Sequence, residues 1–230
     1  MSDFAEVIVL VEGLTERRFI KEILAPHLSF KHIFLKPIIL KKPGVAGGDV
    51  KFARARNDIG IHLKQRRETW LTLLVDYYGI RSDWPGYAES RIQPSPALKA
   101  KVMCQHTAQK VEELFASQDA ARRFIPYVSM HEIEALLFSD SEMLAKGLGV
   151  TRSEVEKILR SCGEPEAIND NPSGAPSKRL DLLTTRFKKT TTGIEIARTI
   201  GIPKMRSACP LFDAWISKLE SLVGSEDGEA

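Results

Sequence analysis

The feature that most constrains the fold of this chain is a set of three short apolar runs, each of which leads into acidic residues. The runs cover residues 6–11 (EVIVLV), 70–75 (WLTLLV) and 124–130 (FIPYVSM). The acids that follow them are Glu12, Asp76, Glu132 and Glu134. Such runs are typical of strands buried in a parallel sheet. Because ligands bind outside the carboxyl ends of the strands in these sheets, we expect the acids to meet at one edge.

Helical patterns between the runs predict an α/β fold. Strand–helix–strand crossovers imply parallel strands, so we expect a Rossmann-like, mostly parallel sheet flanked by helices, with a further strand within residues 33–40. From Ser139 onward the pattern becomes helical. We therefore expect an α/β domain over residues 1–140, a helical C-terminal part over residues 141–223 packed on it, and a disordered acidic tail over residues 224–230.

Local signals set the expected helix ends. We expect Thr15 to cap the helix after the first run and Pro26 to close that helix. Ser95 followed by Pro96 is typical of a helix start. Thr151 and Glu154 have the spacing of a capping box. Further short helices are expected near residues 178–187, 193–200 and 210–223.

Size and charge narrow the class of protein. With 230 residues and a net charge of +3, the chain suits one sizeable domain with an appended part, and it is far less basic than a nucleic-acid coat protein. Its cysteines lie far apart and are odd in number, which favours a reducing cytoplasm over a disulfide framework or a zinc site. No run approaches the roughly 20 apolar residues of a membrane-spanning helix. The first residues lack the pattern of a signal peptide, so neither membrane nor export is expected.

Two of the acids have acidic companions nearby. Glu16 follows Glu12 by four residues, at the start of the next helix, where the positive end of the helix dipole favours an acid. Both can serve one metal ion, although Glu16 equally fits the ordinary decoration of a helix start. Asp83 follows Asp76 but precedes Trp84-Pro85-Gly86, so a turn-forming role competes with metal binding there.

The third acidic segment is His131-Glu132-Ile133-Glu134. Glu132 and Glu134 share a face in an extended segment and diverge in a regular helix, so one or both can be metal ligands. His131 has two open roles, as a general base or carboxylate partner, or as a structural histidine. A carboxylate cluster is costly unless something positive neutralises it, and a hard divalent cation, Mg²⁺ or Mn²⁺, suits these ligands.

Basic segments are candidates for contacts with a nucleic-acid backbone. They contain Lys41, Lys42, Lys51 and Arg54 around a Gly-rich loop, and Lys178 and Arg179 in a later segment. Residues 186–189 (RFKK) extend the later cluster. Phosphate contacts of this kind are electrostatic. A mobile loop and a solvated helix face are the alternative interpretations.

Several motifs together resemble a known family. They are VEGLTE at residues 11–16, DYYG with a later Pro-Gly turn at residues 76–86, HEIEALLFSD at residues 131–140, PSKRL at residues 176–180, and the Cys-Pro-x-Phe-x-x-Trp segment at residues 209–215. The chain resembles a bacterial Toprim-like family of unknown function, DUF4276. The first two motifs also resemble the Toprim domain of topoisomerases, primases and OLD-family nucleases. The resemblance spans nearly the whole chain and implies a Toprim-like α/β fold.

The resemblance implies roles for the acids. Glu12 would be a general acid/base or metal ligand, and Asp76 a metal ligand. Glu16 would join the first metal site and Glu132 or Glu134 a second. The usual Asp-x-Asp of Toprim domains reads Asp76-Tyr77-Tyr78 here, so its second acid is missing. Either Asp83 or the HEIE segment would replace it, or the site would bind metal weakly.

The leading functional expectation is a metal-dependent nuclease acting on DNA or RNA, with Glu12, Asp76 and His131 in catalysis. The resemblance also implies an ATPase partner of AAA or ABC type in a mobile-element or phage-defence system, and it leaves oligomerisation open. The runner-up is a non-catalytic Toprim-like module that binds an ATPase or a nucleic acid. A third interpretation is a phosphotransfer or nucleotide-hydrolysing enzyme with the same carboxylates. Retained acids favour an enzyme, and the missing second Asp favours the module.

Overall fold

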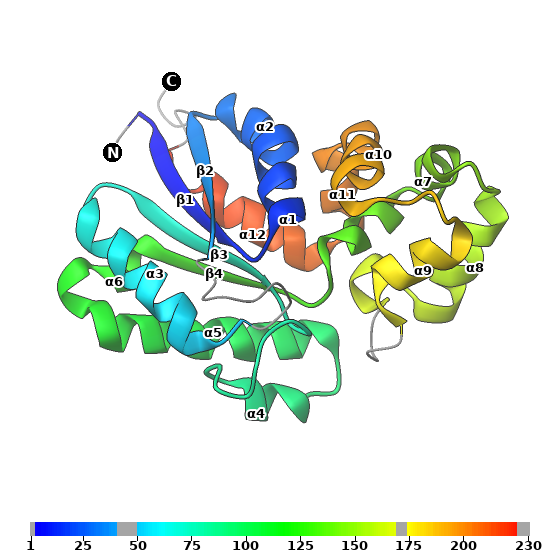
Figure 1. Ribbon diagram of the computed structural model, residues 1–230. Coiled ribbons are helices and arrows are strands. Elements are labelled where there is room, and N and C mark those ends of the chain that lie inside the picture. The colour runs from blue at the N-terminus through cyan, green and yellow to red at the C-terminus, as the bar shows by residue number, and fades with distance from the viewer. Residues whose placement is uncertain (1–2, 41–49, 169–173, 225–230) are drawn as a thin grey trace, which may run out of the picture.

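A parallel four-stranded sheet forms the centre of the protein, in the order β2-β1-β3-β4 (Figure 1). The computed structural model describes residues 3–40, 50–168 and 174–224. The strands are β1 (Ala5–Val11), β2 (Ile33–Ile39), β3 (Trp70–Asp76) and β4 (Phe124–Ser129). The apolar runs at 6–11 and 70–75 lie on neighbouring strands. This confirms the expected α/β fold with a parallel, Rossmann-like sheet.

Alternating strand residues enter two separate hydrophobic cores, because successive side chains of a strand point to opposite faces. Val7 and Val9 of β1 belong to one core, whereas Ile8 and Leu10 belong to the other. The first core is covered by α1 (Leu14–Phe19), η1 (Ile20–Leu24), α2 (Ala25–Ser29) and α12 (Pro210–Glu220). The second is covered by α3 (Phe52–Gln65) and α5 (Pro96–Phe115). The sheet is thus sandwiched between two layers of helices.

The helix after β1 differs from the expectation at both ends. It begins at Leu14 with Gly13 as its N-cap, so Thr15 is not the cap. Pro26 does not close it, because the chain passes through the π-helical segment η1 and continues as α2 to Ser29. A π-helical turn changes the hydrogen-bond spacing, and Pro26 then lies at the start of α2, where its missing N–H is tolerated.

The segment between β3 and β4 contains α5 and several short helices. These are α4 (Tyr87–Arg91), η2 (Ala116–Gln118) and α6 (Ala120–Arg123). The Ser95 side chain accepts a hydrogen bond from Leu98 N, which confirms the predicted start of α5. Buried Arg123 ties the amino end of β3 to its surroundings by donating to main-chain oxygens, among them Leu63 O and Thr69 O. A buried guanidinium with this many hydrogen-bond acceptors has a structural role.

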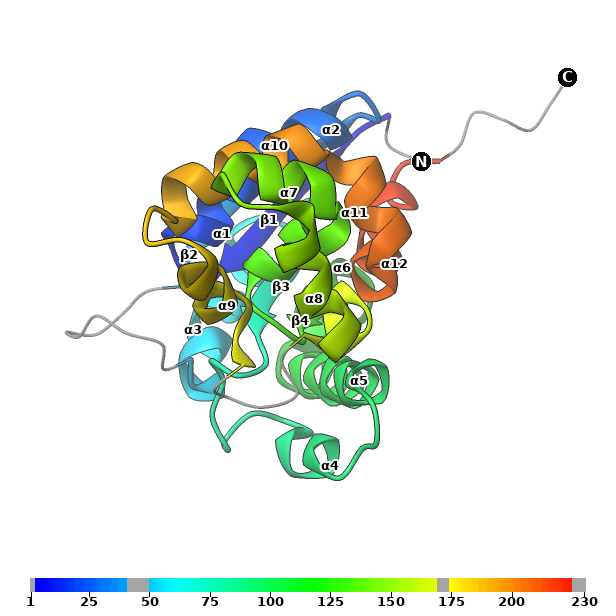
Figure 2. The same ribbon diagram turned by 90° about the vertical axis from the view of Figure 1, so that its right-hand side faces the viewer.

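The chain between β4 and α12 is helical and lies to one side of the sheet (Figure 1), the side that faces the viewer in Figure 2. Its elements are η3 (Ile133–Ser139), α7 (Ser141–Leu148), α8 (Arg152–Cys162), η4 (Pro165–Ala167), α9 (Pro176–Leu183), η6 (Lys189–Gly193), α10 (Ile194–Ile200) and α11 (Ile202–Ala208). The predicted capping box of Thr151 and Glu154 is present. These helices share a hydrophobic core with the strands. Most of the expected acidic tail lies outside the described residues.

Helix α12 brings the end of the chain back to the sheet. Trp215 stacks on Tyr127 of β4, with ring centroids 4.6 Å apart, and its indole N–H donates to Thr72 Oγ1 at 2.9 Å. Burying aromatic side chains of this size stabilises the fold by about 1.5–3 kcal/mol each. None of the helices in the described ranges is both long and apolar enough to cross a membrane.

Candidate active site

The acids at the ends of β1 and β3 lie next to each other because their strands pair directly. Val11 is opposite Leu74, so Glu12 follows β1 at the level of Val75, one residue before Asp76 at the carboxyl end of β3. The Glu12 carboxylate lies against Gly79, where an added Cβ would come within 2.9 Å of both carboxylate oxygens. The glycine of the DYYG motif therefore makes room for the first acid.

Asp76 is held in a strongly acidic environment. Tyr78 N donates to Asp76 Oδ1 at 3.0 Å. Burial raises the pKa of Asp76, the hydrogen bond from Tyr78 opposes that rise, and the charges of Glu12, Glu132 and Glu16 add to it, so the pKa reaches about 8. Near neutral pH, and with no cation present, Asp76 carries a proton for much of the time.

Glu16 joins the group from the first turn of α1. Its Oε2 approaches Gly13 so closely that a Cβ there would lie 3.1 Å away. Burial raises the pKa of Glu16, while main-chain hydrogen bonds and the charge of Lys189 lower it. Glu132 repels it. Glu16 is therefore part of the acidic site and not a surface decoration of the helix start.

Both acids of the HEIE segment point to the same cation, Lys189. Lys189 Nζ lies 2.6 Å from Glu132 Oε1 and 3.6 Å from Glu134 Oε1. Glu132 precedes the 3₁₀ helix η3 in an extended conformation, so the two side chains do not diverge as they would in a regular helix. Glu132 also accepts a hydrogen bond from Ser177 N at 3.0 Å. We refer to Glu12, Glu16, Asp76, Glu132 and Glu134 as the acidic cluster.

The two glutamates differ in protonation. Burial raises the pKa of Glu132, but hydrogen bonds from Lys189 and Ser177 outweigh it and the pKa is lowered. Glu134 is 2% exposed, and its Oε1 has no hydrogen-bond donor. Burial raises the pKa of Glu134 to about 7 although the charge of Lys189 acts against this. One buried carboxylate oxygen in the acidic cluster thus lacks a close donor.

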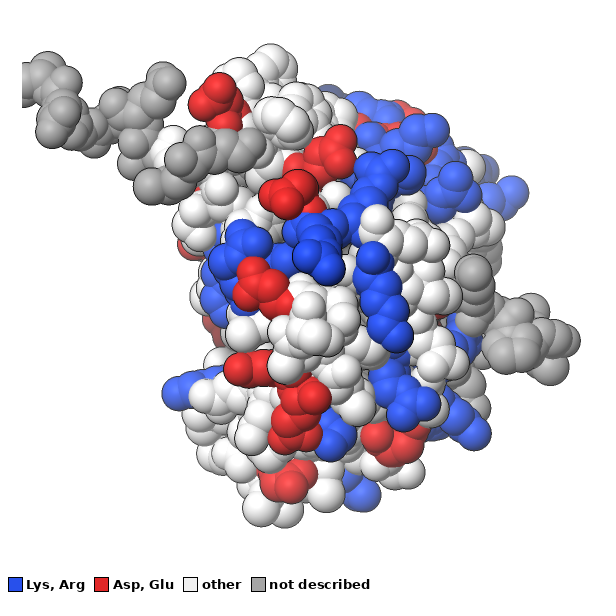
Figure 3. Space-filling model, turned by 90° about the vertical axis from the view of Figure 1, so that its left-hand side faces the viewer, with Lys and Arg blue, Asp and Glu red and all other residues white. Residues whose placement is uncertain are grey.

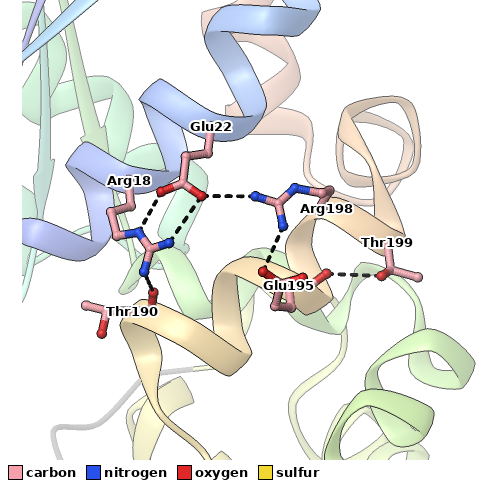
Figure 4. Close-up of polar contacts among 6 residues, drawn as sticks. All are labelled: Arg18, Glu22, Thr190, Glu195, Arg198 and Thr199. Carbon is pink, nitrogen blue, oxygen red and sulfur yellow. Dashed lines mark hydrogen bonds and ion pairs between the residues drawn. The ribbon is translucent and has the colours of Figure 1, made fainter.

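Sequence reasoning did not assign Lys189 to this site. Lys189 belongs to the RFKK segment, whose basic pattern predicts a surface that contacts a nucleic-acid backbone or faces solvent. The main-chain oxygen of the neighbouring Thr190 accepts a hydrogen bond from the side chain of Arg18 in α1 (Figure 4). Arg18 pairs with Glu22 at 2.6 Å, and Glu22 pairs with Arg198 of α10 at 2.9 Å. These contacts hold η6 beside α1. Arg18, which makes the contact with Thr190, lies only two residues after Glu16 in the sequence.

His131 lies next to the acidic cluster but is turned into the protein. Its Nε2–H donates to the main-chain oxygen of Glu166, and its ring stacks on Tyr78 with centroids 6.3 Å apart. The residue is 2% exposed. Of the two roles that the sequence left open, this arrangement favours the structural one.

Asp83 lies in a turn, and its side chain reaches the start of α3. Its Oδ2 accepts a hydrogen bond from Ala53 N at 3.3 Å, near the first turn of α3. The side chain is exposed. A turn and helix-start role explains this residue, and we leave it out of the acidic cluster.

The predicted basic segments border the acidic cluster on two sides. Val50 N donates to Gly79 O at 3.1 Å, which places Lys51 and the start of α3 beside the glycine under Glu12. Arg54 donates to Leu40 O at 2.8 Å. On the other side, Lys178 and Arg179 follow Ser177, the donor to Glu132, and Arg179 Nε donates to Gly174 O at 2.9 Å. Lys41 and Lys42 lie outside the described residues.

A different distribution of charge is seen on the opposite side of the protein. Figure 3 shows the face away from the C-terminal helices, where basic side chains are mixed with acidic ones. A net charge of +3 is likewise modest. Neither this face nor the net charge by itself favours nucleic acid as a partner.

The acidic cluster suits a hard divalent cation in the type of its donors. Carboxylate oxygens are the ligands that Mg²⁺ and Mn²⁺ prefer, and the donorless Oε1 of Glu134 is a candidate ligand atom. In their present rotamers, however, no three His, Cys, Asp or Glu side chains within residues 3–40, 50–168 and 174–224 are arranged to hold one metal ion. Lys189 supplies positive charge there instead. Cation binding would require side-chain rotation and displacement or sharing of Lys189.

Comparison with known proteins identifies a family and no activity. A family model described as "Domain of unknown function (DUF4276)" matches residues 11–220, which confirms the family expected from the motifs. No curated protein and no solved structure matches the chain.

Proposed function

The chain belongs to the DUF4276 family, and we propose that it is a divalent-metal-dependent nuclease that hydrolyses phosphodiester bonds of DNA or RNA. The observation that carries the proposal is the acidic cluster, in which burial and like charges raise the pKa of Asp76 to about 8. Carboxylates with perturbed pKa values in one place are typical of binding and catalytic sites. The relation to Toprim domains and OLD-family nucleases is part of this proposal.

In the proposed site, Glu12, Glu16 and Asp76 would hold one Mg²⁺ or Mn²⁺ ion, and Glu132 and Glu134 a second. Bound cations supply Lewis-acid polarisation of the phosphate and activation of water. Glu12 would accept the proton of the attacking water at a carboxylate oxygen. The water oxygen would bond to phosphorus as the bond to the leaving sugar oxygen breaks, and that oxygen would take up a proton from solvent.

The basic residues would position the substrate. Lys51 and Arg54 border the acidic cluster through Gly79, and Lys178 and Arg179 border it through Ser177. A backbone that crosses the cluster would meet both pairs. Phosphate contacts are electrostatic and do not read the bases. We therefore expect binding that is independent of sequence and weakens steeply with salt.

A cleavage assay tests this proposal. Plasmid, single-stranded DNA and RNA are incubated with Mg²⁺, Mn²⁺ or a chelator. We expect Glu12→Gln to lose about 100-fold or more of the cleavage rate, the scale of general acid–base catalysis. Glu112→Gln, an exposed position on α5, is the matched control and should cleave like the wild type. Equal rates for Glu12→Gln and the control would remove Glu12 from the mechanism.

A non-catalytic module is the second candidate, and one observation favours it. Lys189 already pairs with Glu132 and Glu134, and Tyr78 stands where Toprim domains carry their second Asp. In that case the wild type would bind nucleic acid or an ATPase of AAA or ABC type without cleaving. Absence of cleavage on all three substrates, with salt-dependent binding retained, would establish this alternative.

The setting of the protein is also a proposal. Cys104, Cys162 and Cys209 are all free thiols, which suits a reducing cytoplasm. The family resemblance suggests a defence or mobile-element system with an ATPase partner. Co-purification of the native protein with its neighbours, with and without ATP, tests that association.

A further inference from the structure

A groove lies along the free edge of the sheet, and none of its lining residues belongs to the acidic cluster. Strand β4 has a neighbour on one side only. Helices α5 and α12, from opposite layers, flank this edge and leave a hollow of about 330 Å³. Its walls carry small side chains, Ala97 and Ala100 from α5 and Ala214 from α12. That volume lies at the lower end of small-molecule sites, which range over about 300–1,000 Å³.

The floor of the groove is apolar and rigid. It is formed by Pro126, Tyr127 and Val128 of β4. Tyr127 is stacked on Trp215, with the ring planes 7° apart, and Trp215 is anchored by its hydrogen bond to Thr72. A preformed apolar floor reduces the entropic cost of binding a flat ligand.

The strand edge in the groove is poorly suited to pairing with another strand. Ser129 O accepts a hydrogen bond from Tyr77 N, so the main-chain polar groups of Ser129 face β3. Because these groups alternate in direction along a strand, those of Pro126 and Val128 face the free edge. Pro126 has no N–H to donate. The main chain of Val128 is already hydrogen-bonded to the thiol of Cys104. A partner strand would find few donors there.

Charge gives the groove its selectivity. Lys101 from α5 and Lys218 from α12 line it from opposite walls, and its lining residues include no acid. Burial raises the pKa of the Cys104 thiol, and the charge of Lys218 acts against that rise, so the ammonium group is close enough to act on the groove. Two cations above an apolar floor complement a ligand with an apolar body and one anionic group.

We propose that this groove binds a small, flat apolar molecule that carries an anionic group, with the apolar body on Tyr127 and Pro126 and the anion between Lys101 and Lys218. The site is independent of the proposed nuclease chemistry. Because it lies between helices from the two layers, its occupant would contact both.

Methyl NMR with labelled alanine tests the proposal, using 2-naphthoate as the probe and 2-naphthylmethylamine as its cationic counterpart. We expect saturable shifts of the Ala100 and Ala214 methyl groups with 2-naphthoate, and none at Ala145 in α7. The anion should bind about tenfold more tightly than the amine. The double variant Lys101→Gln/Lys218→Gln should lose this preference, whereas the charge-matched control Lys110→Gln/Lys146→Gln should keep it. Ala214→Leu should reduce binding of both probes by filling the groove.

Three results would overturn the proposal. Equal affinity for the anion and the amine in the wild type would remove the role of the lysines. Absence of saturable shifts at Ala100 and Ala214 would remove the site itself. Groove shifts that follow protein concentration instead of probe, together with a dimer that Ala214→Leu dissociates, would show that a second copy of the chain occupies the groove.

Discussion

Glu134 and Glu166 are two buried glutamates with the same pKa and different surroundings. Burial raises the pKa of each to about 7, and they are 2% and 7% exposed. Both oxygens of Glu166 accept main-chain hydrogen bonds at the start of α12, from Leu211 N at 2.8 Å and Phe212 N at 2.9 Å. Glu134 has like-charged neighbours and an oxygen without a donor.

The comparison teaches that a raised pKa does not by itself identify a functional carboxylate. Glu166 satisfies two donors that a helix N-terminus would otherwise leave unpaired, and its main-chain oxygen accepts from His131. Its surroundings are those of a structural cap. Glu134 has no such donor at Oε1 and lies among other acids, which is an arrangement suited to binding a cation.

The largest expected effect is on activity in the acidic cluster. We predict that Asp76→Asn abolishes metal-dependent cleavage. Removing only the hydrogen-bond partner of a metal ligand lowers activity about 10–100-fold, so loss of the ligand itself should lower it further. Its melting temperature without metal should equal or exceed that of the wild type, because repulsion is relieved. Calorimetry alongside the cleavage assay measures both. Wild-type cleavage by Asp76→Asn would refute the nuclease proposal at this site, and unfolding would make Asp76 a structural residue.

At Glu166 the expected effect is on stability. Glu166→Ala leaves two main-chain donors without their acceptor, at about 1–3 kcal/mol each, so the free energy of unfolding should fall by roughly 2–6 kcal/mol. Urea denaturation measures this fall. Glu164→Ala, an exposed neighbour, is the matched control. A cost no greater than that of the control would mean that water replaces the carboxylate as the cap.

The pH dependence of stability separates the two regions further. The folded-state pKa values of Asp76 (about 8), Glu134 and Glu166 (about 7 each) lie above their ordinary values of 3.8 and 4.5. The folded protein therefore binds more protons than the unfolded chain, and its stability should fall as the pH rises from about 4.5 to about 8.

Saturating Mg²⁺ should change only one part of this dependence. Bound cations hold Asp76 and Glu134 ionised, so the fall between about pH 7 and pH 8 should disappear and the slope at lower pH should shrink to the contribution of Glu166. Thermal unfolding across this range, with Mg²⁺ or a chelator, measures both parts. An unchanged profile in Mg²⁺ would argue against cation binding at Asp76.

The smallest expected effect concerns Lys189. Its side chain is 41% exposed, so its ion pairs should contribute no more than about 1 kcal/mol to stability, and Lys189→Met should unfold slightly more easily than Lys188→Met. If Lys189 occupies a cation position, Lys189→Met should also bind Mg²⁺ more tightly in calorimetric titration. Equal Mg²⁺ affinity of the two variants would show that lysine and metal do not compete.

Local patterns were sufficient to predict the sheet. The runs at 6–11 and 70–75 became neighbouring parallel strands because continuous apolar segments must be buried on both faces. The acids after them were predicted to share one edge, and the pairing of β1 with β3 places Glu12 and Asp76 there. The start of α5 and the capping box of α8 were also predictable, since caps involve residues only three positions apart.

Tertiary structure decided the partners of the charged side chains. Lys189 looks like any other residue of a basic surface cluster, yet it pairs with Glu132, 57 positions away. Glu166 lies in a polar segment, yet it caps α12, 45 positions away. A charged residue in solvent and one in a buried ion pair look the same in the sequence. The energy of the charge depends on burial and on its neighbours, and only the packing of distant segments brings those neighbours together.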